Sequence, residues 1–442
     1  MRLKSFRIQN YKSIIDSGEC RLSENDGITV LAGQNESGKS SILQAIRDFE
    51  NETIDLDSVR EDDSTPTITC VYCDIVEDTK RFRAMDNDDL TSNIWNYYLN
   101  LGELRLTKKL GEKTKLVSSI EIMAADKIME IIQNVNGESK IWNEKVKKGE
   151  IDKDEIEIFD VDDTLQEIIK VLVSLTPYNL FFDDFCDILP NKILLSEFKS
   201  GGSSTKGYQA VKNVETILGA DFIKLDSLSD GRRETTQTSY HETLTAEFNE
   251  KWKQRIGEGA GAKVHVKYYR DESGASYLKF YVETKKGEYL PVEKRSQGFK
   301  WFLSFYLQLK AENKGERKLI ILFDEPGMYL HSKAQSDMIK VFEELSHKNQ
   351  IIYSTHSPYL IDTSKLHRVR LVLNTKDNGT TAEKITSGKI NNQLESLKPI
   401  IDAIGLEVAM PFSVAKWIFL SKVLHDSSEM TPIIPAQSTP PI

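Results

Sequence analysis

The sequence predicts an α/β fold in which helices pack on a largely parallel β-sheet. The prediction rests on three apolar runs that read as strands, which are "GITVLAG", "LIILF" and "QIIYSTHS". Helical patterns follow the first two runs, and after the first one Ile42, Ala45, Ile46 and Phe49 recur at the spacing of one helix face. Alternation of this kind is typical of parallel sheets, because each crossover helix returns the chain to the same sheet edge.

The composition is that of an ordinary soluble protein with an acidic balance. The chain has 442 residues, with 58 Lys+Arg against 68 Asp+Glu and a formal net charge of −10. This length allows two or three domains, and the charge argues against a generally basic nucleic-acid coat while leaving a local basic groove possible. No signal-peptide pattern and no run of ~18 apolar residues is found, so we expect a cytoplasmic protein that contacts no membrane.

A glycine-rich loop, "GQNESGKS", follows the first strand and precedes the first helix. It matches G-x-x-x-x-G-K-[ST], in which backbone N–H groups surround phosphates, the lysine reaches the outer phosphates and the serine hydroxyl binds Mg²⁺. A chance glycine loop is the alternative, which the flanking strand and helix disfavour. The predicted ATP-binding residues are Gly33, Gln34, Asn35, Glu36, Ser37, Gly38, Lys39, Ser40 and Ser41, with Lys39 also catalytic and Ser40 also a metal ligand.

Two adjacent carboxylates, Asp324 and Glu325, end the apolar strand "LIILF". Burying an unpaired charge costs roughly several kcal/mol, so two acids at the end of a core strand indicate that a cation or hydrogen-bond donor lies beside them. Neighbouring side chains on a strand point to opposite faces, so one acid can hold a metal while the other faces a water molecule. We predict Asp324 as a Mg²⁺ ligand and Glu325 as the residue that polarises the attacking water. An N-cap aspartate beside a surface glutamate is the alternative.

Two further motifs, one at His356 and one at Ser296 and Gly298, complete an ordered set of four. His356 comes directly after an apolar strand, where it can hydrogen-bond a γ-phosphate, although a lone histidine there is more often structural. Ser296 and Gly298 precede a helix that is apolar nearly all round and therefore buried. The N-terminus of such a helix can bind an anion, and an ordinary core helix with a serine cap is the alternative.

The order of these motifs resembles the ATP-binding-cassette (ABC) head of SMC-like and RecF-like ATPases. "IQNYKSI" is similar to the N-terminal strand of that group, and "DEPGMYLHSKAQ" with "STHSPYLID" resembles the OLD (overcoming lysogenization defect) family, through a histidine at position 331. The fold class predicted from this resemblance is an α/β P-loop NTPase with an ABC-type ATPase head and an inserted, mainly helical dimerisation element.

The resemblance implies that ATP lies between two heads, so that Ser296 and Gly298 serve the partner's nucleotide in a homodimer or higher oligomer. We expect a first lobe at 1–124, a helical dimerisation insertion at 125–255, a second lobe at 256–375 and a C-terminal extension at 376–442. OLD proteins usually continue into a Toprim nuclease domain.

The C-terminal extension departs from that pattern. Ser421 and Lys422 stand where a Glu-Gly pair is expected, and the Pro-rich tail "EMTPIIPAQSTPPI" is too short for a domain. We therefore expect a vestigial or truncated Toprim start and no nuclease activity in this chain, with a separate nuclease or effector as partner.

The leading functional prediction is an Mg²⁺-dependent ATPase whose head engagement serves a DNA-linked defence or repair process. A non-hydrolysing, ATP-gated scaffold that holds and releases an effector is the alternative, and an ATP-dependent nuclease is a weaker one. Direct DNA contact is possible through "GRR", "KWKQR" or "KVHVKYYR", although each stretch reads more simply as a solvated face or a hairpin.

Overall fold

The structure is a computed structural model of the whole chain. It describes residues 1–384 except for 25, 52–55, 61–63, 76–87, 110–118, 152–157, 183–187, 202–205, 253–262, 286, 296, 313–317, 329, 331 and 376–378. The predictions for Ser296, for the histidine at position 331 and for the Toprim-like positions 421 and 422 therefore lie outside the described residues.

The main sheet has 12 strands in the order β7-β6-β5-β1-β2-β16-β15-β4-β14-β13-β8, with β3 paired to β1. One half is parallel, as the sequence predicts, and contains β15 (Val369–Thr375), β4 (Ile28–Ala32), β14 (Gln350–Thr355), β13 (Leu319–Phe323) and β8 (Tyr178–Phe182). The other half is antiparallel and contains β1 (Arg2–Tyr11), β2 (Ile14–Asp16), β3 (Cys20–Arg21), β5 (Thr67–Cys73), β6 (Leu104–Lys109), β7 (Ser119–Ile122) and β16 (Gly379–Lys384). The sheet is thus mixed, with the parallel part confined to one side.

Both faces of the parallel half are buried, which explains its unbroken apolar strands. On β13, Leu319, Ile321 and Phe323 pack into one hydrophobic cluster, while Ile320 and Leu322 pack into a second cluster on the other face. Helix α1 (Lys39–Asp48) covers the second face and α10 (Ser332–Ser346) covers the first. Alternate residues of one strand therefore hold two helical layers on the sheet.

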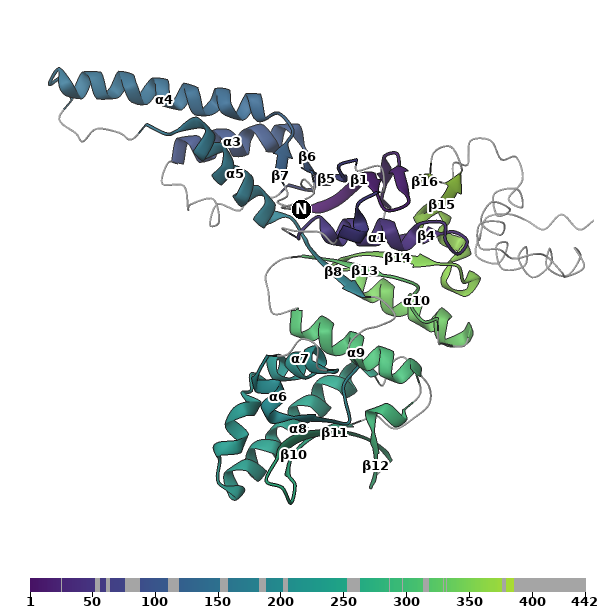
Figure 1. Cartoon of the computed structure of the whole chain (residues 1–442). Helices are drawn as coiled ribbons and strands as arrows, with labels where there is room; N and C mark the ends of the chain where they lie inside the picture. Colours follow the sequence, from purple (N-terminus) through teal and green to yellow (C-terminus); the bar gives the residue numbers. More distant parts are fainter. Residues whose placement is uncertain are drawn as a thin grey trace, which may run out of the picture.

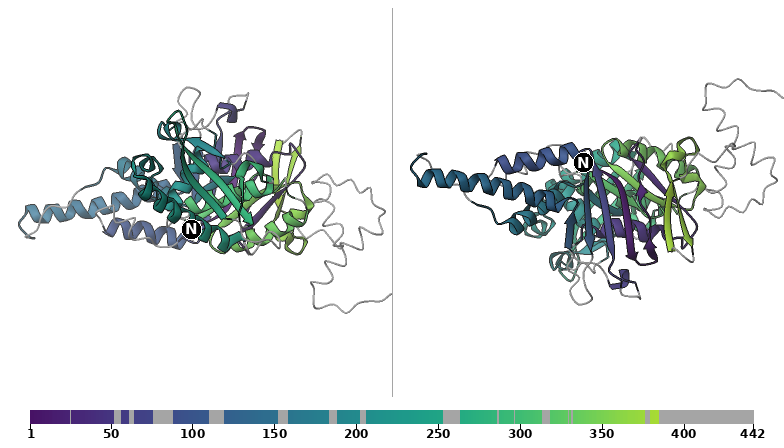
Figure 2. Two further views of the ribbon diagram at one scale, coloured as in Figure 1. Left: turned by 90° about the horizontal axis from the view of Figure 1, so that it is seen from below. Right: turned by 90° about the horizontal axis from the view of Figure 1, so that it is seen from above.

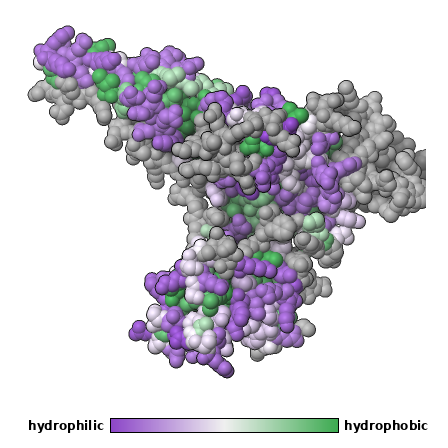
Figure 3. All heavy atoms as spheres, in the orientation of Figure 1, coloured by the Kyte–Doolittle hydropathy of each residue, from purple (hydrophilic) through white to green (hydrophobic). Residues whose placement is uncertain are grey.

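An arm of three helices projects from the antiparallel half (Figure 1), and two further views also show it extending away from the sheet (Figure 2). It consists of α3 (Asp88–Leu101), α4 (Ala125–Lys147) and α5 (Val161–Leu175). Its base shares the second cluster with the sheet through residues such as Ile94, Ile128 and Ile168. Apolar residues are visible among polar ones on α4 (Figure 3). The exposed large apolar residues of the arm are Leu99, Leu101, Ile141 and Ile158.

A second unit lies on the other side of the parallel strands (Figure 1). Its sheet has the order β10-β11-β12, with β9 also paired to β11. The strands are β9 (Lys192–Leu194), β10 (Lys263–Arg270), β11 (Ser276–Lys285) and β12 (Glu288–Pro291), and the helices are α6 (Leu195–Lys199), α7 (Tyr208–Leu218), α8 (Asp230–Trp252) and α9 (Gln297–Glu312). The hairpin predicted from "AKVHVKYYR" and "YLKFYVETKK" is present as β10 and β11, which pair antiparallel.

The predicted domain boundaries differ from this arrangement. β8 falls inside the predicted helical insertion, yet it pairs with β13 and belongs to the main sheet. The hairpin β10–β11 was expected in the second lobe, but its apolar face packs on α8, which ends the predicted insertion. β16 falls in the predicted C-terminal extension and pairs with β15, so the head continues to Lys384. Strand pairing between distant segments, which local patterns do not show, accounts for each difference.

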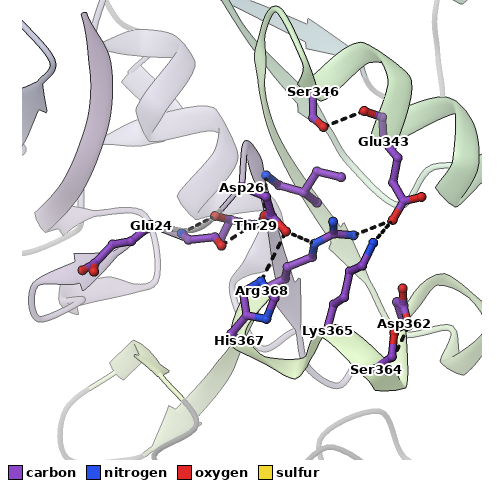
Figure 4. Close-up of polar contacts among 12 residues, drawn as sticks. Glu24, Asp26, Thr29, Glu343, Ser346, Asp362, Ser364, Lys365, His367 and Arg368 are labelled. Carbon is purple, nitrogen blue, oxygen red and sulfur yellow. Dashed lines mark hydrogen bonds and ion pairs between the residues drawn. The ribbon is translucent and has the colours of Figure 1, made fainter. Parts of the chain in front are cut away.

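An ionic network around the buried Arg368 ties the loop before β4 to α10 and to the segment before β15 (Figure 4). Arg368, whose side chain is 6% exposed, donates to Asp26 Oδ2 at 2.6 Å and to Glu343 Oε1 at 3.2 Å. His367 Nε2 lies 3.2 Å from Asp26 Oδ2, and Lys365 donates to Glu343 Oε1. Burial alone would raise the pKa of Asp26, but the hydrogen bonds from Arg368 and the Ile28 amide lower that pKa below its usual value.

The remaining described helical segments are short 3₁₀ turns, at Leu56–Ser58, Phe222–Ser227, Val292–Lys294, Pro358–Leu360 and Thr363–Arg368. Among the helices that the structure describes, none has the length and apolar character needed to cross a membrane.

Candidate nucleotide-binding site

The glycine-rich loop joins the carboxyl end of β4 to the N-terminus of α1, as the sequence predicts. Gly38 precedes the helix with φ 97°, and Glu36 also has a positive φ of 63°. A Cβ added to Gly38 would collide with Thr380 of β16, and one added to Gly33 would lie 2.5 Å from the Val372 carbonyl oxygen. Only glycine fits both positions. The first turn of α1 contains no acidic residue of its own, as suits the N-terminus of a phosphate-binding helix.

Lys39 lies inside the loop, with 5% of its residue surface exposed. Its ammonium group donates to the carbonyl oxygens of Gly33 at 3.0 Å and Gln34 at 2.8 Å. It also lies 3.2 Å from Glu325 Oε1, across the gap between the loop and the end of β13. The predicted phosphate-binding lysine and the predicted base are therefore directly paired.

Asp324 is the centre of a hydroxyl cluster at the end of β13. Its Oδ1 accepts from Ser40 Oγ at 2.9 Å and from Ser354 Oγ at 2.7 Å, while its own N–H donates to the Phe182 carbonyl at 2.8 Å. Burial raises the pKa of Asp324, and the neighbouring charge of Glu325 raises it further, against the effect of the two hydroxyl donors. The carboxylate is thus held in place but is poorly solvated.

Glu325 turns sharply away from the strand, with a positive φ of 46° that L-residues rarely adopt. Its N–H donates to Ser354 Oγ at 2.7 Å, and its Oε2 accepts from the His356 N–H at 3.2 Å. His356 Nδ1 lies 2.8 Å from the same oxygen, at an ion-pair distance but outside hydrogen-bond geometry. The strained backbone aims this carboxylate at Lys39 and His356 rather than along the strand.

The structure therefore brings five predicted residues together from three parallel strands, namely Lys39, Ser40, Asp324, Glu325 and His356. We call this group the nucleotide edge. The carboxyl ends of parallel strands β4, β14 and β13 meet there, which is where ligands bind open α/β sheets. Gln34, Asn35, Ser37 and Ser41 lie in the same loop or in the first turn of α1. Gly298 lies in the first turn of α9, which packs on α7.

Ser354 is a functional candidate that sequence reasoning missed. It is fully buried on β14, and its single hydroxyl donates to Asp324 while accepting from the amide of Glu325. A sequence signal existed, because Ser354 stands two residues before His356 and alternate strand residues share a face. The sequence does not show that β14 lies beside β13, and this pairing is what places the Ser354 hydroxyl next to Asp324 and the amide of Glu325.

The oxygen donors at this edge suit Mg²⁺. Mg²⁺ prefers hard oxygen ligands and is usually held by one or two carboxylates together with phosphates and water. Ser40 and Asp324 supply a hydroxyl and a carboxylate oxygen 2.9 Å apart, at the mouth of the loop. Among the described residues, no group of three or more His, Cys, Asp or Glu side chains could hold a metal ion by itself.

A family match agrees with this geometry. The family described as "AAA ATPase domain" matches residues 1–361. The chain belongs to that family. Membership, together with the parallel strands that end at the glycine-rich loop, confirms the predicted α/β P-loop ATPase fold. An ATPase family with this loop binds nucleotide, and usually Mg²⁺ with it.

Two relatives match shorter parts of this AAA ATPase domain protein. The uncharacterized protein MJECL43 of Methanocaldococcus jannaschii is 33% identical over 139 residues, which cover 29% of this chain and 35% of that protein. An OLD nuclease of Thermus scotoductus is 40% identical over 65 residues, which cover 14% of this chain and 12% of that protein. The chain therefore spans well under two thirds of either relative's length. The OLD branch and the missing Toprim domain stay predictions.

Solved structures of SMC heads are among those that this chain is similar to, at low identity and with TM-scores below 0.5. The match to an SMC head bound to the C-winged helix domain of ScpA covers 86% of this chain and 97% of that chain, with 12% identity and a TM-score of 0.45. The match to the SMC head domain from Thermotoga maritima covers 87% of this chain and 100% of that chain, with 11% identity and a TM-score of 0.40.

Proposed function

We propose that this protein is an Mg²⁺-dependent ATP hydrolase. The observation that carries the proposal is the convergence of Lys39, Ser40, Asp324, Glu325 and His356 at the nucleotide edge. Lys39 and the loop amides would bind the phosphates, and Ser40 and Asp324 would hold the metal, which neutralises charge that develops on the phosphates. Glu325 would accept a proton from water, and His356 would contact the γ-phosphate.

Two single substitutions test the hydrolase. Lys39→Ala should abolish both nucleotide binding and phosphate release, and Glu325→Gln should keep binding while turnover falls by roughly 100-fold or more. Lys348→Ala and Glu272→Gln, both at exposed positions, are the matched controls. Phosphate release measured by a coupled assay decides the matter, and unchanged turnover in both site variants would refute the assignment.

An ATP-gated scaffold is the second candidate, and one observation favours it. Both oxygens of Glu325 are already engaged, one near Lys39 and the other near His356, so the predicted base is paired with cationic or N–H groups rather than free to accept a proton. A scaffold would bind ATP tightly with negligible turnover. Binding without phosphate release, both alone and with DNA present, would favour the scaffold over the hydrolase.

We further infer that two heads engage around ATP, with Ser296 and Gly298 of one copy serving the nucleotide of the other. The α3–α5 arm is the best candidate for the dimerisation element, because it projects from the head and exposes Leu99, Leu101, Ile141 and Ile158. Light scattering of Glu325→Gln with ATP should show a dimer. Ile141→Glu should weaken that dimer, and Lys140→Glu, a surface change on the same helix, should not.

The cellular role that we propose is a DNA-linked defence or repair process with a separate nuclease or effector. Its support is the short similarity to an OLD nuclease. Incubation of the pure chain with plasmid DNA, ATP and Mg²⁺ should leave the DNA intact, while cleavage would move the assignment to a nuclease.

A further inference from the structure

The open face of the second unit's sheet carries a row of three lysines. Strand register places Lys267 of β10 opposite Lys279 of β11, and Lys279 opposite Lys192 of β9. Directly opposite residues on antiparallel strands point to the same side of a sheet. The other side is the buried one, because Leu278 and Phe280 flank Lys279 along β11 and are both fully buried.

Aromatic side chains lie on both sides of this row. Tyr269 stands opposite Tyr277 on one side, and His265 stands opposite Tyr281 on the other. The Lys279 ammonium lies 3.8 Å from the centre of the Tyr269 ring, and that of Lys192 lies 4.9 Å from the Tyr277 ring. We call this group of Lys192, Lys267, Lys279, Tyr269 and Tyr277 the lysine face. Figure 1 places its sheet at the end of the molecule farthest from the α4 arm.

The lysine face is unfavourable by itself. Like charges directly opposite one another destabilise a sheet, and three of them span only ~10 Å at the usual strand spacing. Among the ion pairs formed by described residues, none involves Lys192, Lys267 or Lys279. The bordering carboxylates are engaged elsewhere, since Glu283 lies 3.6 Å from Lys263 and Asp226 lies 2.8 Å from Arg270.

A cleft opens where this face meets helix α8. Its volume is about 650 Å³, within the usual range for a small-molecule site. Its lining includes Lys267, Tyr281, Tyr289, His265 and His241. The two histidine rings stack at 3.8 Å, and the exposed Tyr289 ring meets His265 edge-on at 5.0 Å. Flat rings therefore line the cleft, together with Lys267 of the lysine row, the Arg233–Asp230 ion pair and the carboxylate of Glu234.

We propose that the lysine face binds single-stranded nucleic acid. Its lysines would contact successive phosphates, its tyrosines would stack on bases, and the adjacent cleft would accept one base at the edge of the sheet. An open sheet face that combines cations with exposed aromatic rings matches both parts of a single strand, whereas duplex bases are already stacked and are not accessible. The overall charge of −10 does not oppose this local contact, because charges farther away than ~10 Å are largely screened at ordinary salt concentrations.

Fluorescence anisotropy with a labelled oligothymidylate of ~20 nucleotides tests the proposal. Replacing both Lys267 and Lys279 with Gln should weaken binding about tenfold or more. It should also reduce the slope of log K against log salt by about 1.4, because each phosphate contact of a single strand contributes ~0.7. Tyr269→Ala should weaken binding by roughly fivefold or more through lost stacking. Replacing Lys145 of the distant α4 and Lys148, which caps its C-terminus, with Gln changes the net charge equally and should have no effect.

Three outcomes would overturn the proposal. One is unchanged affinity in the double lysine variant, checked by circular dichroism to be folded. Another is tighter binding of duplex than of single strands. The third is a double lysine variant that loses polyglutamate binding as much as oligothymidylate binding, while Tyr269→Ala leaves oligothymidylate binding unchanged. That result would make the lysine face a general anion-binding surface. Oligothymidylate binding is measured without ATP and again in the Lys39→Ala variant. A negative result for the lysine face is therefore independent of whether the protein hydrolyses ATP.

Discussion

The nucleotide edge and the lysine face treat charge in opposite ways. At the nucleotide edge, Lys39 and Glu325 lie 3.2 Å apart, and Asp324 accepts hydrogen bonds from two hydroxyls. On the lysine face, three cations stand in one row, with no carboxylate of the described chain paired to them. Both regions are suited to phosphate, one as a closed loop and the other as an open surface.

The difference follows from burial. An unpaired charge in the interior costs several kcal/mol, roughly, so the nucleotide edge is stable only with each charge paired or hydrogen-bonded. A charge on an open sheet face keeps its water, so three lysines can stay unpaired at a modest cost from their mutual repulsion. A ligand at the nucleotide edge must therefore displace the existing partners of these charged groups. An anionic ligand on the lysine face would instead supply ion-pair partners that the three lysines lack.

The largest expected effect contrasts two glycines with similar backbone angles. Gly38 has φ 97° and Gly274, in the β10–β11 turn, has φ 84°. A Cβ at Gly38 would collide with Thr380, whereas one at Gly274 would meet nothing within 4 Å. Gly38→Ala should therefore lower the free energy of unfolding by about 3–5 kcal/mol and weaken ATP binding, while Gly274→Ala should cost about 1 kcal/mol through its backbone angle alone. Urea unfolding and nucleotide binding measure both effects, and equal losses would contradict the tight fit of Thr380 over the loop.

The next effect contrasts the ionic network around Arg368 with the lysine face. Arg368→Met should lower the free energy of unfolding by about 2–3 kcal/mol, because Asp26 and Glu343 would lose the buried guanidinium that they share. Lys279→Gln should change stability little, because the loss of its contact with the Tyr269 ring is offset by relief of repulsion from Lys267 and Lys192. A strongly destabilised Lys279→Gln protein would show that the contact with Tyr269 outweighs this repulsion.

The nucleotide edge could be predicted from the sequence because its residues follow recognisable local patterns. The glycine loop, the acidic pair after "LIILF" and the histidine after "QIIYST" each end an apolar run, and parallel strands bring such ends to one edge. The parallel half of the sheet was predictable for the same reason. Ser354 was missed because its role depends on which neighbouring strand it faces.

The domain boundaries and the lysine face could not be predicted in this way. β8 joins the main sheet by pairing with β13, and no local pattern specifies a partner so distant along the chain. Lys192 precedes Lys267 by a stretch that includes helices α6, α7 and α8, so only strand register places the two in one row. "KVHVKYYR" alone reads as a solvated hairpin, because one strand shows only part of the row.

A smaller effect is expected at Ser354, which we regard as a positioning residue. Ser354→Ala should slow ATP turnover about tenfold while changing the KM for ATP little, because the amide of Glu325 and the carboxylate of Asp324 lose a shared hydroxyl. Ser276→Ala is the matched control in the second unit, where the hydroxyl donates to Asp226, and its turnover should stay normal. A large rise in KM with unchanged kcat would assign Ser354 to nucleotide binding instead.

The smallest effect contrasts two carboxylates whose pKa values shift in opposite directions. Burial raises the pKa of Asp324, so its ionised form destabilises the folded state at neutral pH, and this penalty is relieved as pH falls through the raised pKa. Hydrogen bonding by the Gly287 amide is the main cause that lowers the pKa of Glu283. Its contribution is therefore present above the usual glutamate range and is lost as pH falls through the lowered pKa.

Neutral amides at these two positions should consequently change stability with opposite signs. Asp324→Asn should raise the free energy of unfolding at neutral pH by about 1 kcal/mol without nucleotide, and the gain should shrink toward about pH 4. Glu283→Gln should lower stability at neutral pH, and its loss should also shrink in acid. Urea unfolding across this pH range measures both, and ATP with Mg²⁺ should stabilise wild type more than Asp324→Asn. If both amides destabilised the protein equally at neutral pH, Asp324 would be a structural partner of Ser40 and Ser354 rather than a charge kept in place for a metal.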